Sequence, residues 1–192
     1  MTDAVQPLAV RSQSARVPAV DPKADRQRYY MLTHGSHLID TARFLGGDIT
    51  SVSATLVRRD GMHCWFVATE FADGSVGHLD LTVAVQMDWH EGFQIYGTHG
   101  SVIGRTWLLW YFRASEVEGF SSRDRQFHRP LGEDAQVFRR QIEGFAETVL
   151  TGAAQHGATV DDGVATTKVM VAIARSAAGA GRVKVAGVTG AV

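Results

Sequence analysis

Residues 33–47 of the chain read THGSHLIDTARFLGG, and this stretch constrains the fold more than any other part of the sequence. Its apolar residues recur at helical spacing, and it ends in two glycines, which favour the left-handed end of a helix. At about 100° per residue, Leu38, Ala42 and Leu45 form one packing stripe. We therefore expect a helix with a polar flank that can face a cavity. The residues of this flank are His34, His37, Asp40 and Thr41.

The middle of the chain has the alternation that is typical of β-strands. Residues 49–58 predict a half-buried strand, and residues 62–72 and 75–87 predict a hairpin around the turn signal Asp73-Gly74. A two-residue turn there would place two sets of side chains together on one face. These sets are Trp65, Val67 and Thr69 on the first arm, and His78, Asp80 and Thr82 on the second.

The remaining segments complete an α+β pattern. Strands are expected at residues 93–96 and 101–112, a polar loop at 113–133, helices at 134–150 and 159–178, and a short last strand at 182–186. The apolar face of the first of these helices would be Phe138, Ile142, Phe145 and Val149. The expected fold is therefore α+β, with a mostly antiparallel sheet of about five or six strands and helices packed on one face.

Composition indicates a globular protein of ordinary charge. The chain has 192 residues, 45% of them hydrophobic, and a formal net charge of −1, so neither nucleic acid nor a membrane surface is indicated as a partner. The single cysteine, Cys64, excludes an internal disulfide, and no signal peptide or membrane span is visible. A cytoplasmic location is expected. Residues 1–26 hold three of the four prolines and predict a flexible N-terminal arm before a domain at 27–188.

The run Gly35-Ser36-His37-Leu38-Ile39-Asp40 resembles the opening helix of the second domain in the glucose-fructose oxidoreductase / inositol dehydrogenase family (Gfo/Idh/MocA). The likeness continues in residues 89–102, WHEGFQIYGTHGSV, and in two closing helices at 138–152 and 161–176. This resemblance implies the substrate-binding and oligomerising half of an NAD(P)-dependent oxidoreductase that acts on a sugar, a polyol or a related alcohol. Related second domains associate through the open face of their sheet, which would make this chain a homo-oligomer.

The dinucleotide-binding half of that family has no counterpart in the sequence. A Rossmann fingerprint needs Gly-x-Gly-x-x-Gly between a strand and a helix, so that backbone amides can approach a pyrophosphate. The nearest glycine runs, at 97–104 and 179–181, are better interpreted as turns. The resemblance implies NAD or NADP as the cofactor. We expect neither nucleotide to bind this chain alone. A separate Rossmann-domain chain is a possible partner, and whether the lone chain is an enzyme stays open, with inactivity expected.

His37 is the candidate catalytic residue, because imidazole can accept and donate a proton near neutral pH. In related enzymes the matching histidine lines the substrate pocket with an aspartate four residues earlier and a lysine from the nucleotide domain. Here Thr33 stands at the aspartate position, and Thr33 and His34 are the expected substrate-facing residues. The alternative is a structural histidine on a helix face. The His34, His37 and Asp40 spacing is too weak to predict a metal site, and no metal or cofactor ligands are assigned.

Two functions remain open from the sequence. The first is the enzyme part described above, which would take a small polar substrate. The second is a non-enzymatic, stand-alone domain that binds a small ligand or a protein partner. For the mixed face that carries Trp65 in the predicted hairpin, a partner subunit and solvent are both possible neighbours.

Overall fold

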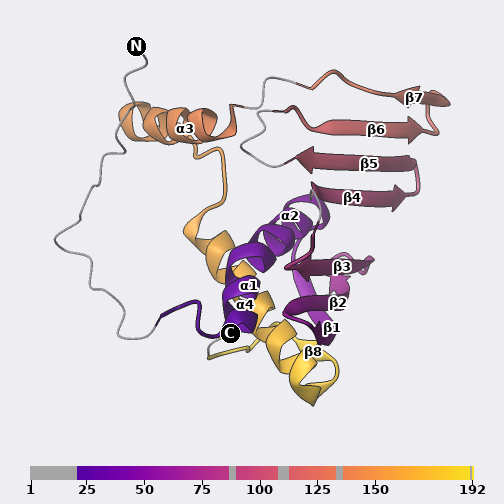
Figure 1. Ribbon diagram of the computed structural model, residues 1–192. Helices are drawn as coiled ribbons and strands as arrows, with labels where there is room; N and C mark the ends of the chain where they lie inside the picture. The colour runs from indigo at the N-terminus through magenta and orange to yellow at the C-terminus, as the bar shows by residue number, and fades with distance from the viewer. Residues whose placement is uncertain (1–20, 87–89, 108–112, 133–135, 191) are drawn as a thin grey trace, which may run out of the picture.

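Two antiparallel four-stranded sheets form the framework of the computed structural model, which describes residues 21–86, 90–107, 113–132, 136–190 and 192 (Figure 1). The first sheet has the order β3-β2-β1-β8. Its strands are β1 (Ile49–Arg59), β2 (Met62–Phe71), β3 (Val76–Val83) and β8 (Val183–Lys184). The second sheet has the order β4-β5-β6-β7. Its strands are β4 (His90–Gly97), β5 (Gly100–Trp107), β6 (Glu116–Ser121) and β7 (Gln126–His128).

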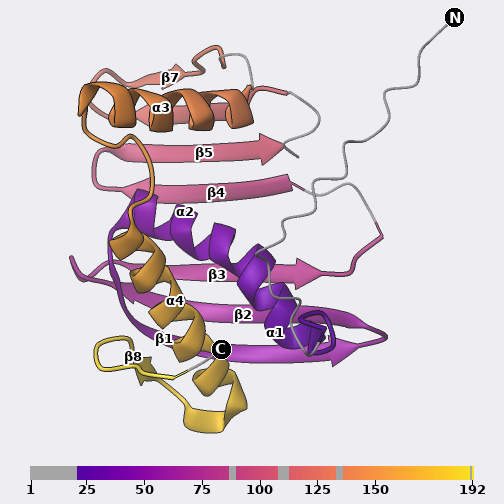
Figure 2. The ribbon, with the colours of Figure 1, turned by 90° about the vertical axis from the view of Figure 1, so that its left-hand side faces the viewer.

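The helices lie on one side of the two sheets. Helices α2 and α4 lie over the first sheet, and α3 lies over the second (Figure 2). Their bounds are α1 (Arg26–Tyr30), α2 (Ser36–Gly46), α3 (Val137–Thr151) and α4 (Val160–Arg175), with π-helical turns η1 (Met31–Gly35) and η3 (Ser176–Ala180). The α+β class and the antiparallel sheet are thus confirmed. The eight described strands are divided between two sheets, rather than forming one sheet of five or six.

Several boundaries differ from those expected. Residues 113–133, expected as a loop, contain β6 and β7, where Phe120 and Phe127 pack with ring centroids 5.1 Å apart. The pairing of these two rings across a short hairpin outweighs the polar composition of the segment. The strand expected at 101–112 ends at Trp107, and residues 108–112 lie outside the described part of the chain. Residues 1–20 of the expected N-terminal arm also lie outside it.

Local signals in the sequence place the helix ends correctly. Gly47 and Gly152 end α2 and α3 with φ of 86° and 72°, which L-residues with a side chain rarely adopt. At the start of α4, the Thr159 hydroxyl accepts a bond from the Asp162 amide, and the Asp162 carboxylate accepts one from the Thr159 amide. This reciprocal cap satisfies two amides that would otherwise lack partners.

The core lies between the first sheet and helices α2 and α4. Its most deeply buried large side chains are Trp65, Ile39, Ile173, Val52 and Val169. In α2 the expected stripe is only partly correct, because Leu38 and Ala42 pack against this core while Leu45 is 37% exposed. Among the described residues, no helix is long and apolar enough to cross a bilayer.

The register of the β2–β3 hairpin differs by one residue from the expected one. Trp65 pairs with Leu81 and Val67 with Leu79, so the Asp73-Gly74 signal lies in a three-residue loop instead of a two-residue turn. The Asp73 carboxylate accepts bonds from the amide and the hydroxyl of Ser75, at 2.9 and 2.7 Å. The Phe71 amide donates to the Ser75 carbonyl at 2.9 Å, so the loop consists of Ala72, Asp73 and Gly74.

A one-residue shift exchanges the two faces of a strand. Trp65 and Thr69, expected on the open face, are 1% and 3% exposed and lie under the helices. The open face carries Phe66, His78, Asp80 and Thr82 instead, and Phe66 is 48% exposed. The expected placement of Trp65, Val67 and Thr69 on the open face is therefore wrong, whereas that of His78, Asp80 and Thr82 on the open face is correct.

Candidate functional site

The start of α2 presents the candidate residues on a turn of irregular helix. Thr33 and His34 belong to the π-helical turn η1, and His37 follows in the first turn of α2. Gly35 between them is buried, and a Cβ there would lie 2.5 Å from Met31 Sδ and 3.6 Å from the side chain of Leu81. A side chain at this position would therefore displace the Met31 thioether, whereas its contact with Leu81 of β3 would be an ordinary one. Such π-helical turns frequently occur at functional sites.

The three candidate residues have different surroundings. His37 is exposed, while Thr33 and His34 are half-buried. The Thr33 hydroxyl donates to the backbone carbonyl of Tyr29 at 2.8 Å, so it is engaged within the helix. Thr33 therefore bonds to its own helix through the hydroxyl, and His37 is the candidate most accessible to a ligand.

His34 has a pKa below the ordinary value of histidine. Burial is the largest cause, because removal from water disfavours the charged ring, and the nearby His37 lowers the pKa further. Glu91, at the start of β4, opposes both effects. At neutral pH, His34 is therefore mainly uncharged, and the charges of its two neighbours are coupled to its protonation.

A row of aromatic rings connects this turn to the core. The ring of Tyr30 lies 6.3 Å from that of His34 and 5.3 Å from that of His63, measured between centroids. The ring of His63 in turn stacks on Trp65 at 5.6 Å. These contacts restrict the orientation of η1, because Trp65 and His63 are buried in the sheet.

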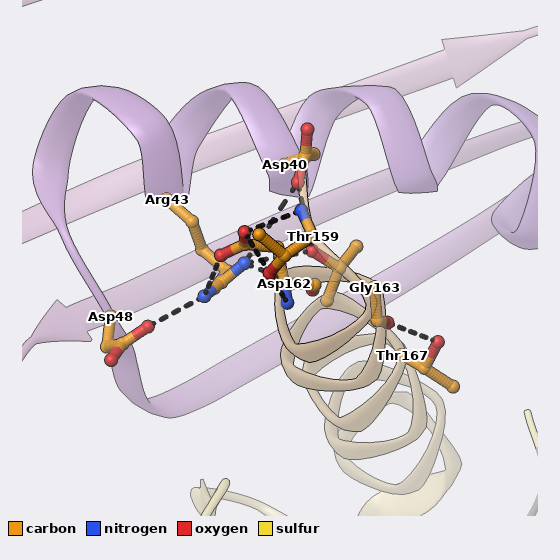
Figure 3. Close-up of polar contacts among 8 residues, drawn as sticks. Asp40, Arg43, Asp48, Thr159, Asp162, Gly163 and Thr167 are labelled. Carbon is orange, nitrogen blue, oxygen red and sulfur yellow. Dashed lines mark hydrogen bonds and ion pairs between the residues drawn. The ribbon is translucent and has the colours of Figure 1, made fainter. Parts of the chain in front are cut away.

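Arg43 connects the other end of α2 to α4 (Figure 3). Its guanidinium donates to the Asp48 carboxylate at 2.9 Å and to the Asp162 carboxylate at 3.3 Å. It also donates to the Asp162 carbonyl at 3.1 Å and the Thr166 hydroxyl at 3.3 Å, and its side chain is only 10% exposed. The Asp40 carboxylate lies 4.0 Å from Arg43 and accepts a bond from Thr166. Asp40 thus contributes to the contact between α2 and α4.

A cavity of about 650 Å³ opens beside this network. Asp40, Thr41 and Phe44 of α2 line one side, and the loop before α4 supplies His156. The expected polar flank is therefore divided: Asp40 and Thr41 line the cavity, whereas His34 and His37 lie one turn earlier and do not line it.

Some residues of this region had no signal in the sequence. Glu91 and His156 come close to α2 only through the fold, and neither has a local motif. Asp162 was recognisable as a helix cap but not as a partner of Arg43, which is 119 residues away. Within the described ranges, no three His, Cys, Asp or Glu side chains are grouped so that they could hold a metal ion.

Comparison with known proteins identifies the domain. A family model described as the GFO/IDH/MocA C-terminal domain matches residues 6–103, just over half of the chain. The chain belongs to the Gfo/Idh/MocA family. The resemblance seen in the sequence is thus confirmed, and α2 lies within the matched residues.

Solved structures share the fold of this Gfo/Idh/MocA domain at low sequence identity. An oxidoreductase from Agrobacterium radiobacter, in complex with NAD+, L-tartaric acid and magnesium, is 15% identical with a TM-score of 0.66, covering 81% of this chain and 48% of that chain. Aldose-aldose oxidoreductase from Caulobacter crescentus, complexed with glycerol, is 19% identical with a TM-score of 0.64, covering 78% and 45%. An NAD binding oxidoreductase from Klebsiella pneumoniae is 16% identical with a TM-score of 0.62, covering 79% and 49%.

The chain therefore spans about half the length of these oxidoreductases. None of the curated proteins matches it.

Proposed function

We propose that this chain is the substrate-binding and oligomerising half of an NAD(P)-dependent oxidoreductase that acts on a sugar, a polyol or a related alcohol. The supporting observation is the placement of His37, an exposed imidazole at the start of α2, beside the half-buried His34. The names of the solved neighbours, which include an aldose-aldose oxidoreductase, support the substrate class. The single thiol, Cys64, is unpaired, which suits a cytoplasmic location.

In this proposal His37 moves the proton of the substrate. Oxidation of an alcohol requires loss of the hydroxyl proton, and a positioned imidazole can accept it near neutral pH. His34 is mainly neutral, so it places no positive charge beside the substrate hydroxyl. Its ring can donate or accept a hydrogen bond. Thr33 holds its bond to Tyr29 and therefore positions the turn rather than exchanging protons.

The N-terminus of α4 does not fit a dinucleotide. A pyrophosphate needs free amides at a helix N-terminus in a glycine-rich turn, and the first turn of α4 instead carries Asp161 and Asp162 and is capped by Thr159. These carboxylates would repel a phosphate. The nucleotide would therefore be held by another domain or by a separate Rossmann-domain chain.

The open face of the first sheet is the proposed surface for homo-oligomers. Phe66 stacks on His78 with centroids 6.4 Å apart, and His78 contacts Asp80 at 3.1 Å. This mixture of one large aromatic with polar side chains is typical of protein interfaces. The helices lie on the opposite side, so they leave this face free for a second copy (Figure 2).

The test is a reconstituted pair, in which this chain is combined with a nucleotide-binding domain of the family and assayed with aldoses and polyols. His37→Ala should lower kcat by about 10²–10⁴-fold with unchanged circular dichroism, as expected for loss of a general base. His128→Ala, an exposed histidine of β7, is the matched control. Turnover by the His37→Ala pair at the wild-type rate would refute a catalytic role for this residue.

The cavity favours a second function, which is binding of a small polar ligand without chemistry. It is lined by carboxylates, a hydroxyl and the exposed ring of Phe44. Calorimetric titration of the chain alone with the same aldoses and polyols tests this function. Binding that Thr41→Val weakens, and that persists in His37→Ala, would support it.

A further inference from the structure

One face of α2 aligns the candidate catalytic histidine with the cavity. His37, Asp40 and Phe44 are spaced at i, i+3 and i+7, so they lie within roughly 60° of one another around the helix axis. His37 is exposed, and Asp40 and Phe44 line the cavity one and two turns further along. A ligand in the cavity can therefore extend along α2 to the imidazole.

Packing does not explain the exposure of Phe44. Leu38, Ile39 and Ala42 of the same helix contribute to the core, whereas the Phe44 side chain is 87% exposed at the cavity wall. An aromatic ring has a negatively polarised face, which attracts ammonium and guanidinium groups. The exposed ring is therefore suited to contact with a cation.

Negative charge exceeds positive charge beside this ring. One guanidinium, that of Arg43, lies within 4.0 Å of three carboxylates, which belong to Asp40, Asp48 and Asp162 (Figure 3). The Arg43 side chain is only 10% exposed, whereas that of Asp40 is 45% exposed. A ligand in the cavity therefore meets the Asp40 carboxylate more readily than the guanidinium.

The helix ends around the cavity also favour a cation. Phe44 lies in the last turn of α2, where the backbone carbonyls carry partial negative charge. The positive end of α4 lies on the other side, and Asp161 and Asp162 in its first turn offset that charge. The cavity thus disfavours phosphate and carboxylate groups and favours an ammonium group.

The remaining lining groups suit a ligand with several hydroxyls. The Thr41 hydroxyl and the His156 imidazole can donate and accept hydrogen bonds. Gly157 leaves open space, because a Cβ there would meet no atom within 4 Å. The cavity volume of about 650 Å³ is in the range of small-molecule sites. These features combine a cation site with room for a polyhydroxyl chain or ring.

We propose that the ligand of this cavity is a sugar or polyol with a protonated amino group, which is held between the Asp40 carboxylate and the Phe44 ring. The inference rests on the function proposed above, in which a sugar or polyol binds beside α2, and adds the amino group as the feature that the site selects. The helix rises by about 4.5 Å from His37 to Asp40. The hydroxyl groups of the ligand can therefore reach the imidazole while its amino group stays in the cavity.

Calorimetric titration of the chain alone with two matched pairs of compounds tests the proposal at pH 7. D-Glucamine differs from D-sorbitol, and D-glucosamine from D-glucose, only in an ammonium group that replaces one hydroxyl. In at least one pair the amine should bind at least tenfold more tightly than its neutral counterpart, as a hydrogen bond between two charged groups implies. Equal affinities within both pairs would overturn the proposal.

Substitutions locate the amino group. Asp40→Asn removes the charge but can still accept the Thr166 bond, and it should lower the affinity for the preferred amine at least tenfold while changing that for the neutral counterpart less than twofold. Phe44→Leu should lower the amine affinity about two- to fivefold. Asp161→Asn is the matched control, because Asp161 is exposed and does not line the cavity. Equal losses in the two Asp→Asn variants would overturn the assigned site.

The outcomes separate this inference from the proposed function. If each amine and its neutral counterpart bind equally, the amino group is wrong and sugar binding stands. If none of the four compounds binds, the amino-group inference and ligand binding in the cavity are both wrong. The catalytic role of His37 is decided separately, by the turnover of the reconstituted pair.

Discussion

The side chain of Trp65 lies opposite Leu81 across β2 and β3, and both contribute to the core beneath the helices. Trp65 is 1% exposed, so it supports the sheet from the inside. Trp65→Ala should lower the free energy of unfolding by about 3–5 kcal/mol, the usual cost of deleting a large buried aromatic. Urea denaturation measures this cost. A change below 1 kcal/mol would show that the indole is not packed as described.

Phe66 follows Trp65 in β2 and lies on the opposite face of the sheet. Its side chain should contribute little to the free energy of unfolding. Phe66→Lys should leave the unfolding midpoint nearly unchanged, because the side chain is 48% exposed and lies opposite Asp80. If copies of the chain associate through the open face, the introduced charge should weaken that contact. Light scattering should then give the molar mass of the next smaller assembly. An unchanged assembly would exclude this face as the interface.

The pKa of His34 should depend on two neighbouring residues, His37 and Glu91. Its pKa is lowered by burial and by His37 and is raised by Glu91. His37→Ala should therefore raise the pKa of His34, since a repulsive charge is removed, and Glu91→Gln should lower it. Proton NMR of the imidazole resonances measures both shifts. Shifts of opposite sign to these would show that the turn η1 is arranged differently.

Arg43 should stabilise the domain in a pH-dependent way. Bonds from the Thr159 amide and hydroxyl, and then the Arg43 guanidinium, lower the pKa of Asp162. A carboxyl group whose pKa is lower in the folded state stabilises the fold at pH values above its ordinary pKa of about 3.9. This stabilisation is lost as the pH falls through the pKa of the folded state. Arg43→Met should cost about 1.5–3 kcal/mol at pH 7, because it removes hydrogen bonds to charged groups. In urea melts, the difference from wild type should narrow at pH 3.

Gly104 of β5 should not tolerate a side chain. A Cβ at this position would lie 2.2 Å from the ring of Phe93, which packs across the strand pair. Gly104→Ala should cost about 1–3 kcal/mol through overpacking. Gly97→Ala, in the paired strand, is the control, because its Cβ would meet only the Gly100 carbonyl at 3.7 Å. Equal thermal midpoints for the two variants would contradict the packing of Phe93.

The candidate site was only partly predictable from the sequence. The Gly35-x-His37-x-x-Asp40 run identified α2 and its family, because this signal lies within one short stretch of the chain. The approach of Glu91 to His34, and of His156 to the cavity, depends on segments more than 50 residues away. Sequence periodicity describes one element at a time and carries no information on such approaches.

The sequence by itself determined the features that depend on neighbouring residues. The glycines after α2 and α3 and the Thr159 cap of α4 ended or started helices where expected, because each satisfies backbone groups within a few residues. Only the tertiary structure decided which face of β2 is buried. Phe71 pairs with Ser75 instead of Ala72, which places Trp65 beneath the helices, and a one-residue shift reverses every side chain of a strand. Only the tertiary structure, likewise, showed that the described part of the chain does not bury the apolar face of α3, because amphipathicity specifies that a face needs a partner but not where that partner is.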